Sequence, residues 1–125
     1  MVAVDTSTLI AFLEGESGKD VTTFIEHLKK TDVFIPQPVV SEILSDATLT
    51  TSTLAPILAL PRLLIEVGFW ERAGVSRSKV LAHKRKARLA DILIAQSCID
   101  HRCALITRDG DFKNFARYCG LELVR

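Results

Sequence analysis

Residues 2–8 read VAVDTST, three apolar residues followed at once by polar residues that begin helices well. The apolar part predicts a short buried strand from Val2 to Val4, and the polar part predicts a helix that starts directly after it. A strand that passes straight into a helix is typical of proteins whose parallel sheet is covered by helices. The start of the chain therefore places an acid, Asp5, between a strand and a helix.

The same alternation continues along the rest of the chain. We expect further strands at Val33 to Ile35, Arg62 to Val67 and Ala104 to Thr107. Helical spacing of apolar residues predicts helices over or near residues 9–13, 21–28, 38–47, 69–73, 89–99 and 112–119. This order predicts an α/β fold of three layers, α/β/α, with a central parallel sheet. No repeat or linker appears, so we expect one domain over residues 1–125.

The composition indicates an ordinary globular protein of the cytoplasm. Of the 125 residues, 48% are hydrophobic and 25% are charged, which excludes a disordered or fibrous chain. The apolar runs are too short to span a bilayer, and the first residues do not resemble a secretory signal. The cysteines are odd in number and lack C-x-x-C spacing, so we expect free thiols in a reducing compartment: Cys98, Cys103 and Cys119.

The charges are unevenly distributed although the net charge is only +1. Residues 1–76 hold ten acids against five Lys or Arg, and residues 89–125 hold five against five. Residues 77–88 hold six Lys or Arg and no acid. The basic excess is therefore confined to one segment, just before the predicted helix at 89–99.

Two acids follow directly on predicted strands. Asp5 comes directly after the first strand, and a single residue separates Asp109 from the strand at Ala104 to Thr107. Ligands of open parallel sheets bind outside the carboxyl ends of the strands, so both acids fall where a site is expected. Asp91 opens the apolar helix at 89–99 among small residues, and Glu42 lies opposite the apolar stripe of its helix. The helix of Glu42 begins just past the carboxyl end of the strand at Val33 to Ile35, so we expect its outward face to overlook the same edge.

Each of these acids also has an ordinary explanation when taken alone. Asp5 is a suitable helix cap, Glu42 a suitable solvated residue, and Asp91 suits the first turn of a helix. Asp109 belongs to an Asp-Gly turn, and Asp111 suits a helix start. Taken together they indicate a site for a hard divalent cation, which prefers carboxylate oxygens and acts in phosphoryl chemistry.

Other chemistries have little support. The histidines lack the spacing of metal ligands: they are His27, His83 and His101. The chain has no G-x-S-x-G elbow, no phosphate-binding G-x-x-x-x-G-K-[ST] loop and no dinucleotide fingerprint. A nucleotide cofactor is therefore not indicated.

Four short motifs, in this order, resemble the PIN-domain ribonucleases, and among them the VapC-like toxins of prokaryotic toxin–antitoxin pairs. They are Val-Asp-Thr-Ser at 4–7, Val-Val-Ser-Glu-Ile at 39–43, Leu-Ala-Asp-Ile-Leu-Ile-Ala at 89–95 and Leu-Ile-Thr-Arg-Asp-Gly-Asp-Phe at 105–112. Each motif is weak by itself, but their order and spacing are specific, and the match covers almost the whole chain.

The resemblance implies a function for these residues. It makes Asp5, Glu42, Asp91 and Asp109 the catalytic acids and metal ligands, with Asp111 as an outer participant and with Ser7 and Thr107 in support. The implied reaction is hydrolysis of an RNA phosphodiester with Mg²⁺ or Mn²⁺ as cofactor. The resemblance also implies a homodimer, and a small antitoxin protein that covers the cleft.

The segment before Asp91 departs from the family, which commonly has a glycine-containing loop there. This chain has a basic run instead, and we expect RNA contacts from Lys84, Arg85, Lys86 and Arg88. A solvated helix end, or a surface for an acidic protein partner, is the alternative.

Three alternative functions stay open. One is an RNA-processing PIN nuclease without an antitoxin. Another is an Mg²⁺-dependent phosphotransferase with Asp5 as nucleophile, although such sites usually carry a second acid where this chain has Ser7. The third is a receiver-like or other binding module without catalysis, because a fold alone does not decide a function.

Overall fold

A three-stranded parallel sheet forms the centre of the computed structural model, which describes residues 1–125. Its strands are β1 (Val2–Val4), β2 (Val33–Phe34) and β3 (Ala104–Ile106), in the order β2-β1-β3. All three residues of β1 are buried, because helices cover both faces of this central strand. The apolar run that opens the sequence is thus the middle of the sheet.

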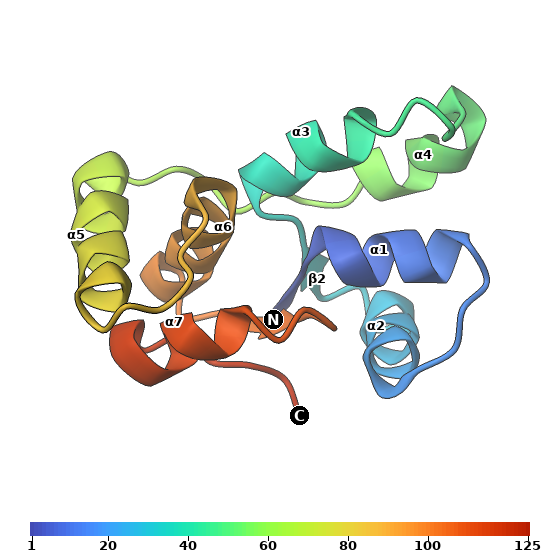
Figure 1. Cartoon of the computed structure of the whole chain (residues 1–125). Coiled ribbons are helices and arrows are strands. Elements are labelled where there is room, and N and C mark those ends of the chain that lie inside the picture. The colour runs from blue at the N-terminus through green and yellow to red at the C-terminus, as the bar shows by residue number, and fades with distance from the viewer.

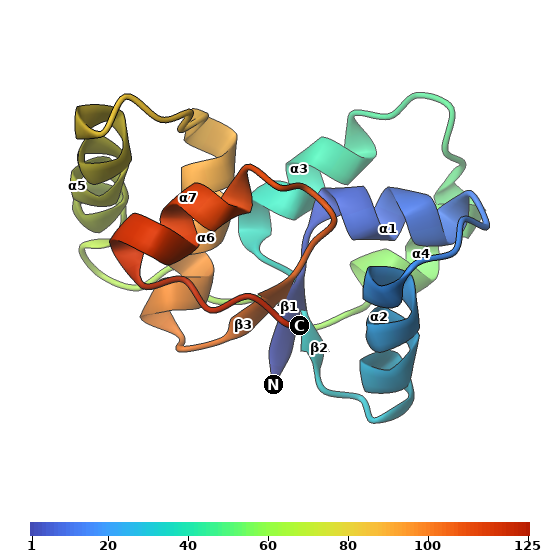
Figure 2. The same cartoon turned by 60° about the horizontal axis from the view of Figure 1, so that its bottom comes forward.

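Seven helices surround the sheet. They are α1 (Thr6–Leu13), α2 (Lys19–Lys29), α3 (Gln37–Leu44), α4 (Thr51–Leu58), α5 (Phe69–Ala82), α6 (Leu89–Asp100) and α7 (Phe112–Cys119). Figures 1 and 2 show α5, α6 and α7 on one side of the sheet and α1, α2 and α4 on the other. The arrangement confirms the predicted α/β/α fold with a parallel sheet. Helix α3 contacts both α1 and α6 and so connects the two helical layers.

The predicted strand at Arg62 to Val67 is wrong. Only Arg62 pairs with the sheet, through an isolated parallel bridge to Ile35. Beyond it the chain leaves the sheet edge for α5, and Leu64 and Val67 are 68% and 99% exposed. An apolar run in the sequence predicts a buried strand, but the same pattern also occurs in a loop whose apolar side chains face solvent, as they do here.

The carboxyl ends of β1 and β3 lie side by side and are joined beyond the last ladder pair. The register sets Val4 opposite Ile106, and the Asp5 N–H donates to the Ile106 carbonyl at 2.9 Å. The loops that follow the two strands therefore start from the same point. One hydrophobic cluster of 24 buried residues packs around this junction and fixes it.

Two smaller expectations concern membranes and thiols. None of the helices is both long and apolar enough to cross a membrane. All three cysteines are free, with Cys98 and Cys103 buried and Cys119 partly buried. Burial raises the pKa of each of these thiols, which keeps them protonated and unreactive at neutral pH.

Candidate active site

Acidic side chains from four parts of the chain gather at the carboxyl edge of the sheet. Oxygens of Asp91, at the start of α6, and of Asp109 and Asp111, in the loop after β3, all lie within 4.8 Å of one another. Asp5 and Glu42 stand outside this close group, but their charges reach Asp91. The structure thus places all the acids singled out in the sequence at one edge of the sheet. Asp111, which was expected as an outer participant, lies in the close group with Asp91 and Asp109.

Hydroxyl groups hold the Asp5 carboxylate in place. Asp5 is only 4% exposed, and its Oδ2 accepts hydrogen bonds from the hydroxyls of Ser7 (2.7 Å) and Thr107 (2.8 Å). The same oxygen caps α1 through a long bond from the Ser7 N–H, at 3.4 Å. Asp5 is therefore a helix cap, as its simplest explanation required. Its Oδ1 has no hydrogen-bond partner and is available to a cation.

The loop after β3 is fixed by its own side chains. Thr107 Oγ1 accepts from the Asp109 N–H at 3.0 Å, and Asp109 Oδ1 accepts from the Asp111 N–H at 2.9 Å. The Arg108 N–H donates to the Ser7 hydroxyl at 3.3 Å, which ties the loop to the start of α1. These bonds hold the carboxylates of the loop in a defined geometry before any ligand arrives.

Glu42 is held by a threonine that the sequence did not reveal as its partner. The Thr6 hydroxyl donates to Glu42 Oε1 at 2.7 Å and joins α1 to α3. The two residues are 36 positions apart, so no local pattern could pair them. This bond explains why a glutamate opposite the apolar stripe of its helix lies at the cleft.

Neighbouring cations neutralise the acids only in part. The pKa of Asp91 is raised from 3.8 to about 6, mainly by burial and further by the charges of Asp109, Asp5 and Glu42. The only ion pair to the group joins Lys86 to Asp111 at 3.1 Å. A divalent cation would relieve this repulsion, and an all-oxygen donor set suits Mg²⁺ or Mn²⁺. The residues present therefore fit such an ion.

The basic segment, residues 83–88, runs from α5 to α6 beside these acids. It is a loop rather than a helix end, because α5 stops before it. Its course follows one face of α7: the ring of His83 stacks on Tyr118 with centroids 4.0 Å apart, and the Lys86 carbonyl accepts from Asn114 at 3.2 Å. The remaining basic side chains are exposed: Lys84, Arg85 and Arg88.

The PIN domain family model matches residues 2–118. The chain belongs to the PIN domain family. Proteins with a PIN domain are generally nucleases, and those nucleases usually use a divalent metal. The acids assembled at the carboxyl edge of this PIN domain, with one ion pair among them, agree with that property. No curated protein matches the chain in sequence.

Solved structures share the fold of this PIN domain over nearly its whole length. VapBC2 from Rickettsia felis, bound to a DNA fragment from its promoter, has a chain that aligns with a TM-score of 0.76 and 18% identity, over 99% of this chain and 98% of that one. FitAcB from Neisseria gonorrhoeae aligns at 0.73 and 18%, over 100% and 97%. FitAB bound to an IR36 DNA fragment aligns at 0.77 and 22%, over 99% and 94%.

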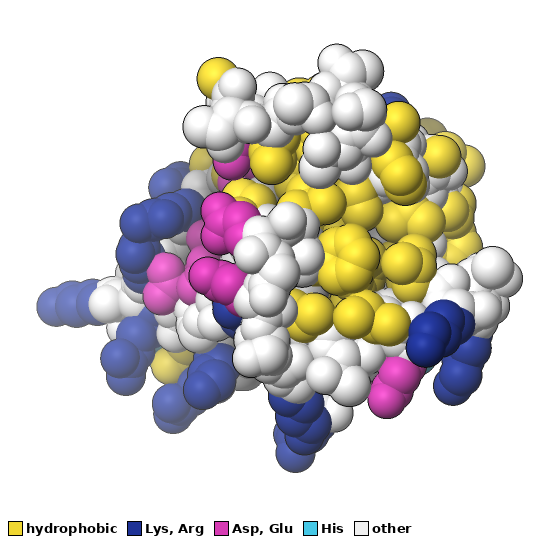
Figure 3. Space-filling view, turned by 90° about the vertical axis from the view of Figure 1, so that its right-hand side faces the viewer, with side chains coloured by type: hydrophobic (Ala, Val, Ile, Leu, Met, Phe, Trp, Pro, Cys, Tyr) yellow, Lys and Arg dark blue, Asp and Glu magenta, His cyan; other side chains and the backbone are white.

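One side of the domain carries a broad apolar surface. Figure 3 looks onto the side of this PIN domain formed by α1, α2 and α4, and it shows acidic side chains beside a broad hydrophobic surface, with Lys and Arg beyond the acids. Partly exposed apolar side chains on these helices include Ile10, Leu13 and Leu58.

Proposed function

We propose that this protein is a metal-dependent endoribonuclease and the toxin of a VapBC-type toxin–antitoxin pair. The observation that carries the proposal is the close group of Asp91, Asp109 and Asp111 beside Asp5 and Glu42, which has a single ion pair, to Lys86. A globular fold tolerates such repulsion where a function needs it. Mg²⁺ or Mn²⁺ is the cofactor that this donor set favours.

The side chains take distinct roles in the proposed reaction. Asp5, Asp91 and Asp109 hold the cation, with Asp111 and Glu42 beside them. Ser7 and Thr107 keep the Asp5 carboxylate oriented, as their bonds of 2.7 and 2.8 Å already do. When bound, the cation supplies positive charge at the phosphate and makes water a better nucleophile. No covalent intermediate with the protein is involved.

RNA, a polyanion, needs positive charge near these acids. The basic segment supplies it from one side of the cleft, through Lys84, Arg85, Lys86 and Arg88. Lys86 stands nearest, because its ammonium is 3.1 Å from Asp111. We infer that phosphate contacts from this segment position RNA, and that binding weakens steeply with salt.

A small antitoxin protein is the proposed partner. The structures of VapBC2 and FitAB named above are complexes, which supports a partner for this chain. The hydrophobic surface formed by α1, α2 and α4 in Figure 3 suits a partner segment that covers its apolar side chains.

A homodimer is also proposed, through a second apolar region. Trp70 and Leu64 are 63% and 68% exposed, and a groove of about 480 Å³ runs between α3 and α5 beside Phe69 and Leu93. Burial of such side chains against a second copy is favourable. Light scattering after size-exclusion chromatography tests this, and a monomer at all concentrations would contradict it.

The experiment that tests the nuclease is cleavage of a mixed pool of structured RNAs by the purified chain with Mg²⁺, Mn²⁺ or EDTA. Asp5→Asn and Asp91→Asn probe the proposed ligands. Asp20→Asn is the matched control, because Asp20 is an aspartate of the same edge that is paired with Arg108 at 2.9 Å.

We expect the wild type to cleave RNA only when metal is present. Asp5→Asn and Asp91→Asn should lose this cleavage, and Asp20→Asn should keep it. Folded protein that is free of inhibitor and cuts no RNA in any metal would contradict the proposal. The protein would then be a binding module.

A further inference from the structure

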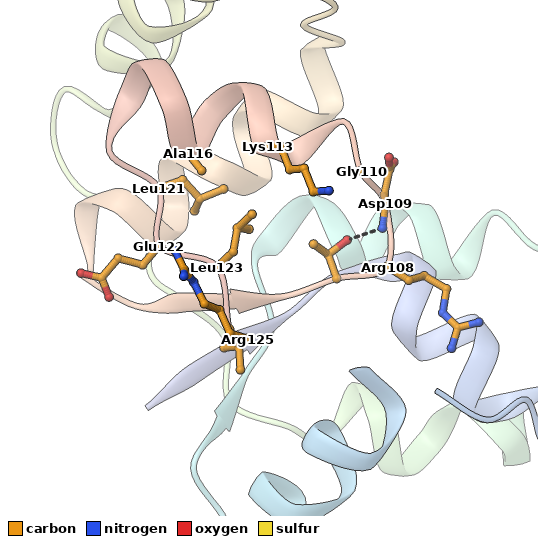
Figure 4. A pocket seen from close by; sticks show the side chains of 11 residues that line it. Arg108, Asp109, Gly110, Lys113, Ala116, Leu121, Glu122, Leu123 and Arg125 are labelled. Carbon is orange, nitrogen blue, oxygen red and sulfur yellow. Dashed lines mark hydrogen bonds between the residues drawn. The ribbon is translucent and has the colours of Figure 1, made fainter. Parts of the chain in front are cut away.

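A cavity of about 780 Å³ opens beside the acids, between α7 and the C-terminal residues 121–125 (Figure 4). Thr107 and Asp109 line it and belong at the same time to the candidate active site. Its volume is within the range of small-ligand sites. A molecule in this cavity would therefore lie next to any phosphate held at the carboxylates.

Three cations line the cavity, and two of them, Lys113 and Arg125, form no ion pair. Figure 4 shows the ammonium of Lys113 extending across the cavity toward the side of Asp109, whereas Arg108 points away. The Arg108 guanidinium is engaged by Asp20 and Glu16 at 2.9 to 3.0 Å. Lys113 is exposed and forms no ion pair. Its charge is thus placed to meet an anion.

Four residues of the lining are apolar, three of which face one another across the cavity. Ala116 lies one turn beyond Lys113 on the same face of α7, and Leu121 and Leu123 stand opposite on the C-terminal residues. These side chains form a floor of the kind that a nucleobase covers with its face. The small side chain of Ala116 leaves the space open.

The C-terminal wall also offers backbone groups. Leu105 in β3 bonds to the Glu122 carbonyl and to the Val124 N–H, both at 2.9 Å. In this parallel bridge the N–H and C=O of Leu123 point away from β3, and neither takes part in a hydrogen bond. A donor and an acceptor at fixed spacing are what the polar edge of a base requires.

We propose that this cavity binds the nucleotide adjoining the scissile phosphate of an RNA strand. The base packs on Ala116, Leu121 and Leu123, and Lys113 binds the phosphate of the same nucleotide. The inference rests on the proposed function, since it needs a phosphodiester at the carboxylates. It adds a subsite that gives cleavage a preference for the base at one position.

Nuclear magnetic resonance on the full, isotope-labelled chain in EDTA tests the cavity without relying on catalysis. The probes are the four ribonucleoside 5′-monophosphates and inorganic phosphate. We expect shifts at Gly110, Lys113, Ala116 and Leu123, and at least about tenfold tighter binding of one nucleotide than of phosphate. Equal affinity for phosphate and for all four nucleotides would overturn the inference, because it would show an anion site without a base.

Two substitutions and a matched control locate the binding. Ala116→Phe fills the cavity, and we expect more than about tenfold weaker nucleotide binding. Lys113→Gln leaves the fold intact, since its side chain is exposed, and weakens binding about three- to tenfold. Arg117→Gln removes a charge from the same helix outside the cavity and leaves binding unchanged. Equal effects of the Lys113 and Arg117 substitutions would overturn the inference.

Sequencing of cleaved ends separates this inference from the proposed function. Ala116→Phe is expected to cut RNA more slowly, still only with metal, and to lose the base preference next to the cut. Cleavage with the same preference in the wild type and Ala116→Phe would overturn the subsite and leave the nuclease standing. Absence of cleavage in the wild type would reject the nuclease, while the nucleotide titration would still decide whether the cavity binds a base.

Discussion

Residues 108 and 109 are neighbours in the chain, yet they take part in two acidic groups of opposite character. Arg108 reaches Asp20 through two bonds of 2.9 Å and Glu16 through one of 3.0 Å. These bonds hold the pKa of Asp20 below its usual value. Asp109 instead joins the group around Asp91, whose pKa rises to about 6.

This difference in pairing distinguishes a structural acidic group from a candidate functional one. The Arg108 group is complete, since each of its charges has a partner within the chain, and it connects the loop after β3 to α2. The Asp91 group lacks such partners apart from Lys86, so the chain leaves its neutralisation to something from outside. The first group is structural, and the second is the candidate site.

The largest expected effect comes from removing a charge of the Asp91 group, whose acids mostly lack a cationic partner. Asp91→Asn should lower metal-dependent RNA cleavage by about 10²–10³-fold. Without metal it should raise the free energy of unfolding by about 1 kcal/mol, a figure reduced for solvent screening because the side chain is half exposed. Cleavage assays and denaturant unfolding in EDTA measure the two effects. A variant that is less stable and equally active would contradict the distinction between the groups.

The complete group should respond in the opposite way. Arg108→Gln leaves Asp20 and Glu16 without their cation, so we expect the midpoint of thermal unfolding to fall by about 3–6 °C. Cleavage should change by less than about threefold, because the Arg108 N–H, which bonds to Ser7, is retained. Calorimetry and the cleavage assay test this. A loss of activity as large as that of Asp91→Asn would show that both groups belong to one site.

The sequence carried much of the fold and the positions of the acids, because both depend on local patterns. Apolar triplets and helical spacing located β1, β3 and most helices, and strand ends located Asp5 and Asp109. Partners far apart in sequence were not predictable: Arg108 with Asp20 is separated by 88 residues, and Lys86 with Asp111 depends on how α7 packs. Which acids have a partner, and so which group is incomplete, required the structure.

The dependence of stability on pH should separate the two groups further. The folded pKa of Asp91, about 6, lies above its ordinary value of 3.8. Between these values the folded chain keeps a proton that the unfolded chain has lost, so the contribution of Asp91 to stability falls as pH rises from about 4 to 6. The paired Asp20, with its lowered pKa, acts in the opposite sense, as its contribution is lost when pH falls.

The difference between wild type and Asp91→Asn isolates the contribution of Asp91 and of its interactions with neighbouring acids, since groups that do not interact with Asp91 cancel. In EDTA we expect the wild type to lose about 1 kcal/mol relative to the variant between pH 4 and 6, with no further change above it. Denaturant unfolding at several pH values measures the difference. A difference that is constant with pH would mean that Asp91 titrates normally in the folded chain.

The smallest effect concerns the cations rather than the acids, and it uses two helix ends with the same backbone. Lys84 after α5 and Arg102 after α6 both have positive φ, +56° and +51°, at the position where helices prefer glycine. Both side chains are exposed. Lys84 lies in the basic segment, whereas Arg102 lies before β3, at the opposite edge of the sheet from the acids.

Lys84→Gly and Arg102→Gly should each stabilise the fold by about 0.5–1 kcal/mol, because glycine removes the same backbone strain. Only Lys84→Gly should weaken RNA binding, and it should reduce the slope of log affinity against log salt by about one. Filter binding over a salt series, with Asp91→Asn as the background to prevent cleavage, compares the two. Equal loss of binding would mean that RNA senses only net charge. A loss confined to Lys84 would show that a strained backbone position is retained because its side chain meets RNA.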